Sequence, residues 1–256
     1  VVAVSAIVTD VTAMKQSERR LLEKSKELQR SNRDLEEFAY AASHDLQEPL
    51  RTIATYCEAI DEDYREKLDE EGVQFLNFVV DATRRMRNQI SGLLEYSRIG
   101  RAPRKFGPVN LSQVFNDVCH DLSTAIDEAG AVVECEKLPV VQGDQRLLHA
   151  LLQNLIANSI KFRATERNPK IHVSAEETDS HWQLSLTDNG IGIDIGQSER
   201  IFQVFQRLHS ATEYPGTGIG LSLCKRIVEL HGGTIALEES AGMGSRFVFS
   251  LDRTRD

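Results

Sequence analysis

The spacing of apolar residues changes once along this 256-residue chain, at the proline-punctuated segment GRAPRKFGP, residues 100–108. Before this segment, apolar side chains recur at steps of three and four residues, which is typical of amphipathic helices. After it, helical patterns alternate with short runs that are typical of strands. We predict helices over residues 111–129, 144–162 and 219–231, and strands over residues 131–138, 171–175, 183–187, 234–239 and 245–251. One uniform layer cannot satisfy both patterns, so we predict two structural parts joined by a stiff linker over residues 101–108.

The part before the linker contains two apolar stripes separated by the acidic stretch DEDYREKLDEEG, residues 61–72. The first stripe comprises Leu46, Pro49, Ile53, Tyr56 and Ile60, and the second comprises Val73, Leu76, Val80, Thr83, Met86, Ile90, Leu93 and Ser97. Two antiparallel helices cannot bury both stripes within one chain. We therefore predict a helical hairpin over residues 39–100 that forms a four-helix bundle in a homodimer.

Residues 13–38 continue the helical pattern upstream, with a weak heptad of leucines at positions 21, 28 and 35. Small and polar residues occupy the other seam position, which is typical of a signalling coiled coil with an easily shifted register, although a plain solvated helix is the alternative. Within residues 1–12, VVAVSAIVTDVT, residues 1–8 have the alternating pattern of a strand. They resemble the last strand of a PAS sensor domain, and a strand that pairs with a second copy is the alternative.

The segment YAASHDLQEPLRTI, residues 40–53, places a histidine and a proline along the first stripe. In the register of that stripe His44 lies opposite the seam, so we expect its imidazole to face solvent. Pro49 removes one helical hydrogen bond and crowds the carbonyl of Asp45, which should loosen the backbone beside His44. A mobile and exposed histidine favours a reactive role over a packing role.

Two glycine-rich segments occur in the mixed part of the chain, TDNGIGI at residues 187–193 and PGTGIGLSL at residues 215–223. Neither has the spacing of a Walker A loop or of the dinucleotide fingerprint. Gly216, Gly218 and Gly220 precede an apolar helical pattern, so the backbone can approach an anion closely at a helix N-terminus. We predict that a triphosphate binds there.

A polar face accompanies these glycines. Asn154, Asn158 and Lys161 recur at steps of four and three residues, which places two amides and one ammonium on one side of a helix. Amide oxygens can bind Mg²⁺ and lysine neutralises phosphate. Hydrogen bonding to neighbouring strands is the alternative role of the two asparagines, which would otherwise be costly to bury.

Asp188 follows an apolar strand pattern, where its carboxylate could accept a hydrogen bond from the exocyclic amine of adenine or could cap a turn. Further on, Phe202 and Phe205 are predicted hydrophobic anchors. Arg207 is a predicted phosphate ligand at the start of a short polar segment that we interpret as a lid.

The formal net charge of −9 argues against a nucleic-acid surface. No run of 18 apolar residues occurs and the N-terminal residues do not have the order of a signal peptide, so we expect no membrane contact and a cytoplasmic location. The four cysteines lack metal or redox spacing and are predicted to be reduced core thiols.

Taken together, these motifs resemble the sensor histidine kinases of two-component systems, and the surroundings of His44 are most similar to the phytochrome-like branch. SHDLQEPLR matches the phosphoacceptor motif, NLIANSIKF the asparagine motif, DNGIGI and GTGIGL the glycine motifs, and IFQVFQR the phenylalanine motif, in the family's order. The resemblance implies a dimeric antiparallel four-helix bundle followed, over residues 109–253, by an α/β sandwich ATP-binding domain of the histidine kinase, gyrase and chaperone type.

The resemblance also implies a function: His44 is phosphorylated by ATP bound with Mg²⁺. The phosphoryl group then passes to an aspartate of a response-regulator receiver, under control of an upstream sensor domain in the full-length protein. Asp45 would orient the imidazole and accept its proton, with Glu48 as the competing candidate. Glu48 stands where many relatives have Thr or Asn, which predicts weak phosphatase activity. The implied nucleotide-binding residues are Asn154, Asn158, Lys161, Phe162, Asp188, Asn189, Gly190, Gly192, Arg207, Gly216, Thr217, Gly218, Gly220 and Leu221, with Asn154 and Asn158 also as metal ligands.

The alternative function is a conformational ATPase or clamp that uses the same ATP-binding sandwich without a phosphohistidine. Such ATPases usually carry a glutamate, as the base for water attack, one turn before the metal-binding asparagine. That position is Asn154 here, which favours phosphoryl transfer to protein.

Overall fold

The computed structural model describes residues 12–99, 106–209, 213–214, 216–239, 242 and 244–252. The predicted strand in residues 1–8, the linker residues 101–105 and part of the predicted lid lie outside the described residues. The side chains of the upstream leucine heptad and of His44 lie outside them as well.

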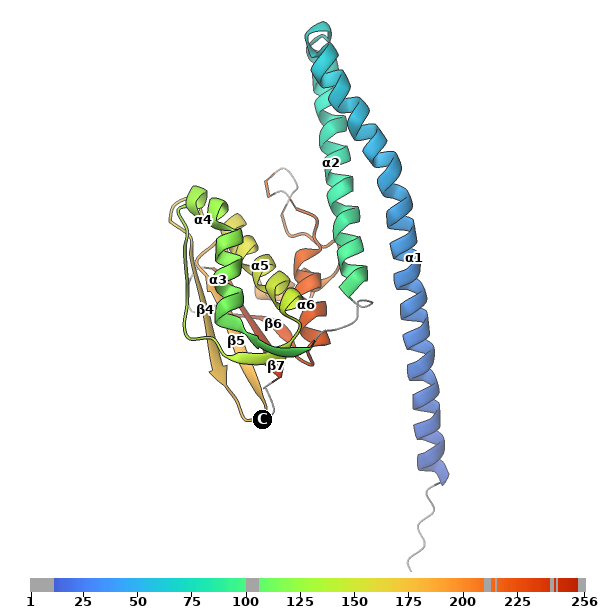
Figure 1. Cartoon of the computed structure of the whole chain (residues 1–256), viewed down its shortest axis with the longest axis vertical. Helices are drawn as coiled ribbons and strands as arrows, with labels where there is room; N and C mark the ends of the chain where they lie inside the picture. The colour runs from blue at the N-terminus through green and yellow to red at the C-terminus, as the bar shows by residue number, and fades with distance from the viewer. Residues whose placement is uncertain are drawn as a thin grey trace, which may run out of the picture.

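Two long helices form the first part of the chain, and Figure 1 shows them as an arm beside the α/β part. Helix α1, Thr12–Tyr64, runs without interruption for 53 residues and contains Pro49. A 3₁₀ turn η1, Arg65–Lys67, leads into α2, Glu70–Ile99. The signalling segment and the first half of the hairpin are thus one continuous helix, and the loss of one hydrogen bond at Pro49 does not end it.

The seam between α1 and α2 has its own seven-residue repeat. The buried residues are Ser43, Leu50 and Cys57 of α1 and Leu76, Thr83, Ile90, Leu94 and Ser97 of α2. Half of the second predicted stripe is thus buried, although its Met86 is 47% exposed. The first stripe lies in solvent: Leu46 is 49%, Ile53 44% and Ile60 42% exposed. One chain therefore leaves the first stripe uncovered, as expected if a second copy is needed to bury it.

The second part is a two-layer α/β sandwich. Its five-stranded sheet has the order β2-β4-β5-β7-β6, in which β2 is parallel to β4 and the other neighbours are antiparallel. The elements are β1 Gly107–Asn110, α3 Leu111–Asp121, α4 Ser123–Ala129, β2 Val132–Cys135, β3 Val140–Gly143, α5 Gln145–Lys161, β4 Lys170–Glu177, β5 His181–Asp188, η2 Ile195–Gln197, η3 Arg200–Phe202, α6 Gly220–Leu230, β6 Ile235–Glu238 and β7 Arg246–Asp252. Helices α3, α5 and α6 lie together on one face of the sheet (Figure 1).

Two details of this part differ from the sequence-based expectation. Strand β1 begins at Gly107, within the predicted linker, and pairs with β3 in a separate two-stranded sheet. Pro108 is tolerated there because a proline on an edge strand loses no ladder hydrogen bond. The predicted helix over residues 111–129 is divided into α3 and α4 at Leu122, whose backbone is not helical.

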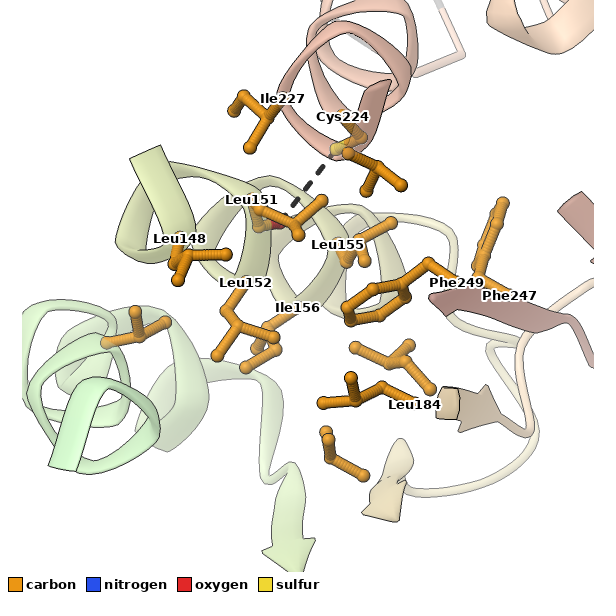
Figure 2. Close-up of a cluster of buried hydrophobic side chains, with 14 of the residues drawn as sticks. Leu148, Leu151, Leu152, Leu155, Ile156, Leu184, Cys224, Ile227, Phe247 and Phe249 are labelled. Carbon is orange, nitrogen blue, oxygen red and sulfur yellow. Dashed lines mark hydrogen bonds between the residues drawn. The ribbon is translucent and has the colours of Figure 1, made fainter. Parts of the chain in front are cut away.

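The core of the sandwich is centred on α5. Figure 2 shows leucine and isoleucine side chains of this helix packed between α6 and the phenylalanines of β7. Leu151, Leu155 and Ile156 are completely buried, and the Cys224 thiol donates to the Leu151 carbonyl oxygen at 3.8 Å. All four cysteines are free, as predicted. Within the described residues, no helix is long and apolar enough to span a bilayer.

Helix α2 ends against the sandwich. Ile99 belongs to the same buried cluster as the core of the α/β part. Gly92, which precedes Ile99 in α2, is so close to Ile219 that an added Cβ would lie 2.7 Å from the Ile219 Cδ1 atom. The residue that precedes α6 therefore packs directly on the hairpin.

Candidate functional site

A cavity of about 230 Å³ lies between α5, the loop after β5 and the start of α6. Its lining comprises Asn154, Asn158, Ser159, Lys161, Phe162, Asp188, Ile191, Gly192, Ile193, Ile201, Gln206, Arg207, Leu208, His209, Tyr214, Gly216, Thr217, Gly218, Gly220, Leu221, Ser245 and Phe247. The structure thus brings together nearly all of the residues that the sequence marked in the second part of the chain.

Helix α5 contributes the polar face of the cavity. The Asp144 side chain caps its N-terminus by accepting from the Arg146 amide at 3.0 Å, and the apolar face then fixes the rotation of the helix in the core. The Asn154 Nδ2 atom donates to the Ala150 carbonyl at 2.8 Å, which turns Oδ1 towards α6. An added Cβ on Gly220 would lie 2.8 Å from that Oδ1.

The glycine segment before α6 leaves room for a ligand and for the side chains that surround it. Gly218 has a φ of +73°, which few residues with a side chain adopt. An added Cβ on Gly216 would lie 2.6 Å from the Lys161 ammonium nitrogen. The free N–H groups at the start of α6 complete a cradle that favours an anion.

Two cations face this cradle. Burial and the nearby positive charge of Arg207 lower the pKa of Lys161. Arg207 is held in place because its Nη2 atom donates to the Tyr214 carbonyl at 2.6 Å. Two like charges in a partly buried cavity destabilise one another unless an anion lies between them, so the arrangement favours a polyanionic ligand.

Asp188 lies in the cavity lining at the end of β5 and is only 8% exposed. Its Oδ1 atom accepts from the Gly190 amide at 2.8 Å and the Ser245 amide at 3.1 Å, and Oδ2 accepts from the Ser159 hydroxyl at 3.1 Å. Burial raises the pKa of Asp188 in spite of these three bonds. A buried carboxylate that lines a cavity is suited to accept a hydrogen bond from an amine.

Two of the predicted binding residues do not line the cavity. The Asn189 side chain accepts from the Lys170 amide at 2.8 Å and donates to the Asn168 carbonyl at 3.0 Å, so it ties the loop to the start of β4. Gly190 packs tightly on α5, where an added Cβ would lie 2.5 Å from the Phe162 carbonyl oxygen. Both residues therefore support the loop without lining the cavity.

Sequence reasoning missed other residues of the lining, notably Ser159, Ser245 and Tyr214. Phe162, His209 and Tyr214 form a group of three rings whose centroids are 4.9 to 5.8 Å apart. Ser159 had one signal in the sequence, because it is a lone hydroxyl in an apolar helical run. The ring contacts join residues on separate segments and had no such signal.

The predicted hydrophobic anchors behave differently from one another. Phe202 is 8% exposed and belongs to the core, as expected, whereas Phe205 is 49% exposed, so its predicted anchoring role is wrong in this conformation. Phe205 has a φ of +65° and donates its amide to the Gly218 carbonyl at 3.0 Å. The turn that begins the polar segment is therefore strained at a bulky residue.

The three residues marked in the first part of the chain all lie on α1. Asp45 and Glu48 are exposed, and the described residues that line the cavity include none from this helix. The predicted exposure of the His44 imidazole lies outside what the structure describes.

Comparison with known families matches both parts of the chain. Residues 34–102 match the His Kinase A (phospho-acceptor) domain, and residues 143–255 match the Histidine kinase-, DNA gyrase B-, and HSP90-like ATPase family. The first match contains His44, and the second contains the entire cavity lining.

Similar proteins extend across both domains. Phytochrome-like protein Cph1 of Synechocystis is 42% identical over 90% of this chain, and cyanobacterial phytochrome A of Nostoc is 42% identical over 88%. The chain spans 31% and 29% of the lengths of these two relatives.

Two solved structures show the same fold. Full-length ShkA in complex with AMPPNP has a TM-score of 0.63 at 22% identity, over 84% of this chain and 45% of that one. ThkA in complex with response regulator protein TrrA has a TM-score of 0.58 at 21% identity, over 97% of this chain and 68% of that one. With a phospho-acceptor helical hairpin followed by this ATPase-type sandwich, the chain belongs to the sensor histidine kinases.

Proposed function

We propose that this chain binds ATP in the cavity, transfers the γ-phosphoryl group to His44, and then passes it to an aspartate of a response-regulator receiver. One observation carries the proposal: a single cavity joins the buried carboxylate of Asp188 to the glycine cradle and two cations at the start of α6. ATP has matching ends, because adenine carries an amine and the triphosphate is a polyanion. The ShkA structure with AMPPNP supports this choice of ligand.

Different residues of the cavity would bind the adenine base and the phosphates. Asp188 would accept from the adenine amine, which distinguishes adenine from a base that carries a carbonyl there. Lys161 and Arg207 would neutralise the phosphates together with the N-terminus of α6. Charge of this kind, fixed in place before the reaction, stabilises the transferring phosphoryl group.

The transfer itself would use residues of α1. A ring nitrogen of His44 forms a bond to the γ-phosphorus, the bond from that phosphorus to the β,γ-bridging oxygen breaks, and ADP departs with the bonding electron pair. The proton of the imidazole passes to a carboxylate. Asp45, next in the chain, and Glu48, one turn on, are the two candidates, and both are exposed.

Mg²⁺ would be held by the side-chain oxygens of Asn154 and Asn158 together with ATP. The fit rests on the amide of Asn154, whose Oδ1 is turned towards the cradle because Nδ2 is bonded to Ala150. Within the described residues, no group of three or more His, Cys, Asp or Glu side chains could hold a metal ion. Bound Mg²⁺ would neutralise negative charge on the phosphates.

A second copy of the chain and a receiver domain are the proposed partners. The exposed apolar residues Ile53 and Ile60 of α1 and Phe75 and Phe78 of α2 support a four-helix bundle, since a monomer would leave them in water. The ThkA complex with TrrA supports the receiver as partner. Control by an upstream sensor domain and a cytoplasmic location stay predictions.

Phosphosite mapping tests this function against the conformational ATPase. The purified chain is incubated with ATP and Mg²⁺, digested at neutral pH, and the phosphopeptides are identified by mass spectrometry. A phosphoryl group on His44 and about one ADP per modified chain are expected, as group transfer requires. Continuous ADP production without any phosphopeptide would instead support the ATPase function.

A further inference from the structure

The segment Ile191–Ile193 is a thin wall between two hollows. On one side it lines the cavity described above, and on the other it lines a second hollow together with Arg167, Asp194, Gly242 and Gly244. Ile191 is 41% exposed. Ile193 packs against the core and Gly192 lies close to Gly244, where an added Cβ would be 3.2 Å from the carbonyl oxygen. Backbone hydrogen bonds at Asn189 and Gly190 add to this packing in fixing the start of the segment.

Arg167 supplies two of these bonds from the loop between α5 and β4. Its Nε atom donates to the Asn189 carbonyl at 2.6 Å and its Nη2 atom donates to the Gly190 carbonyl at 2.8 Å. The planar guanidinium presents such donors in a fixed fork, so it can bridge two successive carbonyls. Asn189 and Gly190 are the residues that connect Asp188 to the wall.

The remaining bonds of this loop come from other directions. The Ile191 amide donates to the Phe162 carbonyl at 3.0 Å, the Asn189 amide donates to the Lys170 carbonyl at 3.2 Å, and the Gly190 amide donates to Asp188 itself. The Asn189 side chain adds its bonds to Lys170 and Asn168. The backbone bonds use the amides of the loop, whereas Arg167 binds its carbonyls. Arg167 therefore opposes rotation of the peptide groups that aim the Asp188 carboxylate and the wall into the cavity.

We infer that Arg167 is a positioning residue for the base end of the nucleotide. It fixes the Asn189–Gly190 peptide groups, and through them the carboxylate and the wall that would contact adenine. The inference rests on the proposed function for the identity of the ligand. It also predicts that Arg167 has no part in holding the triphosphate, because the cradle at Gly216–Gly220 belongs to other segments.

Two probes separate positioning from general stability. The affinities of the full chain for ATP and for inorganic tripolyphosphate, both with Mg²⁺, are measured by calorimetry for the unmodified protein and for Arg167→Met. We expect the Kd for ATP to rise about tenfold or more, the size of one charge-assisted hydrogen bond, while the Kd for tripolyphosphate changes less than about twofold. Far-UV circular dichroism verifies that the variant is folded.

Arg163→Met is the matched control. It removes the same charge from the same loop, but its Nη1 atom donates to the Ile160 carbonyl at 3.2 Å, and among the described residues it makes no hydrogen bond to residues 189–190. ATP affinity should survive this substitution. Arg167→Lys should restore affinity only in part, since one ammonium does not reproduce the fork.

The outcomes are distinct. An unchanged Kd for ATP in Arg167→Met, or an equal loss for ATP and tripolyphosphate, would overturn the inference. Equal losses in the Arg167→Met and Arg163→Met variants would do so as well, because they would point to charge alone. Failure of the unmodified chain to bind ATP would instead overturn the proposed function.

Discussion

Replacing Asp188 with asparagine should abolish tight nucleotide binding without destabilising the empty domain. Asparagine keeps an oxygen for the amides of Gly190 and Ser245. Its new amide group would face the Ser159 hydroxyl, which can accept from it while donating to the Leu155 carbonyl 3.2 Å away. Every polar atom of the variant therefore finds a partner, so no buried group is left unsatisfied.

The charge explains why stability should not fall. Because burial raises the pKa of Asp188, the folded chain binds this proton more tightly than the unfolded chain does. The free energy of unfolding therefore decreases as pH rises through the interval between the two pKa values, and this cost is fully present above the raised pKa. Asparagine carries no charge and removes the cost, so the unliganded variant should melt at the same or a higher temperature.

ATP binding should weaken because asparagine lacks the charge that makes Asp188 a strong hydrogen-bond acceptor. The loss of a hydrogen bond to a charged acceptor costs about 1.5–3 kcal/mol, and an amide that meets the adenine amine donor to donor leaves unsatisfied groups at about 1–3 kcal/mol more. The sum, about 2.5–6 kcal/mol, corresponds to a loss of affinity on the order of a hundredfold to ten-thousandfold. In the unmodified chain, affinity should likewise weaken as pH falls through the raised pKa of Asp188.

Calorimetry with ATP and thermal unfolding of the same samples check both halves of this prediction. Asp194→Asn is the control, because Asp194 is exposed, caps a turn at the Gly196 amide and does not line the cavity. Asp188 does not have the proposed role if Asp188→Asn binds ATP within about threefold of the unmodified chain, or if it loses affinity only because it unfolds.

Three further predictions follow from close contacts and exposure. Gly220→Ala should displace the Asn154 side chain, since the added Cβ would lie 2.8 Å from its Oδ1 atom. ATP binding, measured by titration, should then depend less on the Mg²⁺ concentration. Ile53→Glu places a charge on the uncovered stripe and should convert dimers to monomers in sedimentation analysis, whereas an unchanged mass would contradict the predicted bundle. Gly92→Leu should displace Ile219 and separate α2 from α6, which small-angle scattering would register as a larger radius of gyration, and an unchanged radius would count against this contact.

Regular elements with strong local signals were predicted well from the sequence. The helix expected over residues 144–162 is α5, Gln145–Lys161, because Asp144 caps it and its apolar period is unbroken. Strands β1 and β3 were missed, because each has only four residues and one contains a proline. Their pairing, Gly107 to Gly143, joins residues far apart in the chain and leaves no local pattern.

The residues of the candidate site also divide into those with a local sequence signal and those without one. Asn154, Lys161 and the glycines could be grouped because helix periodicity and backbone freedom are readable locally, and the structure brings them to one cavity. Asn189 was grouped with them by its place in the motif, yet its side chain faces Asn168 and Lys170. Arg167 carried no signal at all, because its role depends on two carbonyls more than twenty residues away.

Transfer of the phosphoryl group to His44 can be tested by labelling with γ-³²P ATP, followed by treatment of the phosphoprotein with acid and alkali. We expect the unmodified chain to carry a label that is labile in acid and stable in alkali, and we expect none in His44→Gln or in Asp188→Asn. A label of the same kind that persists in His44→Gln would show that the phosphoryl group goes elsewhere and would contradict the account.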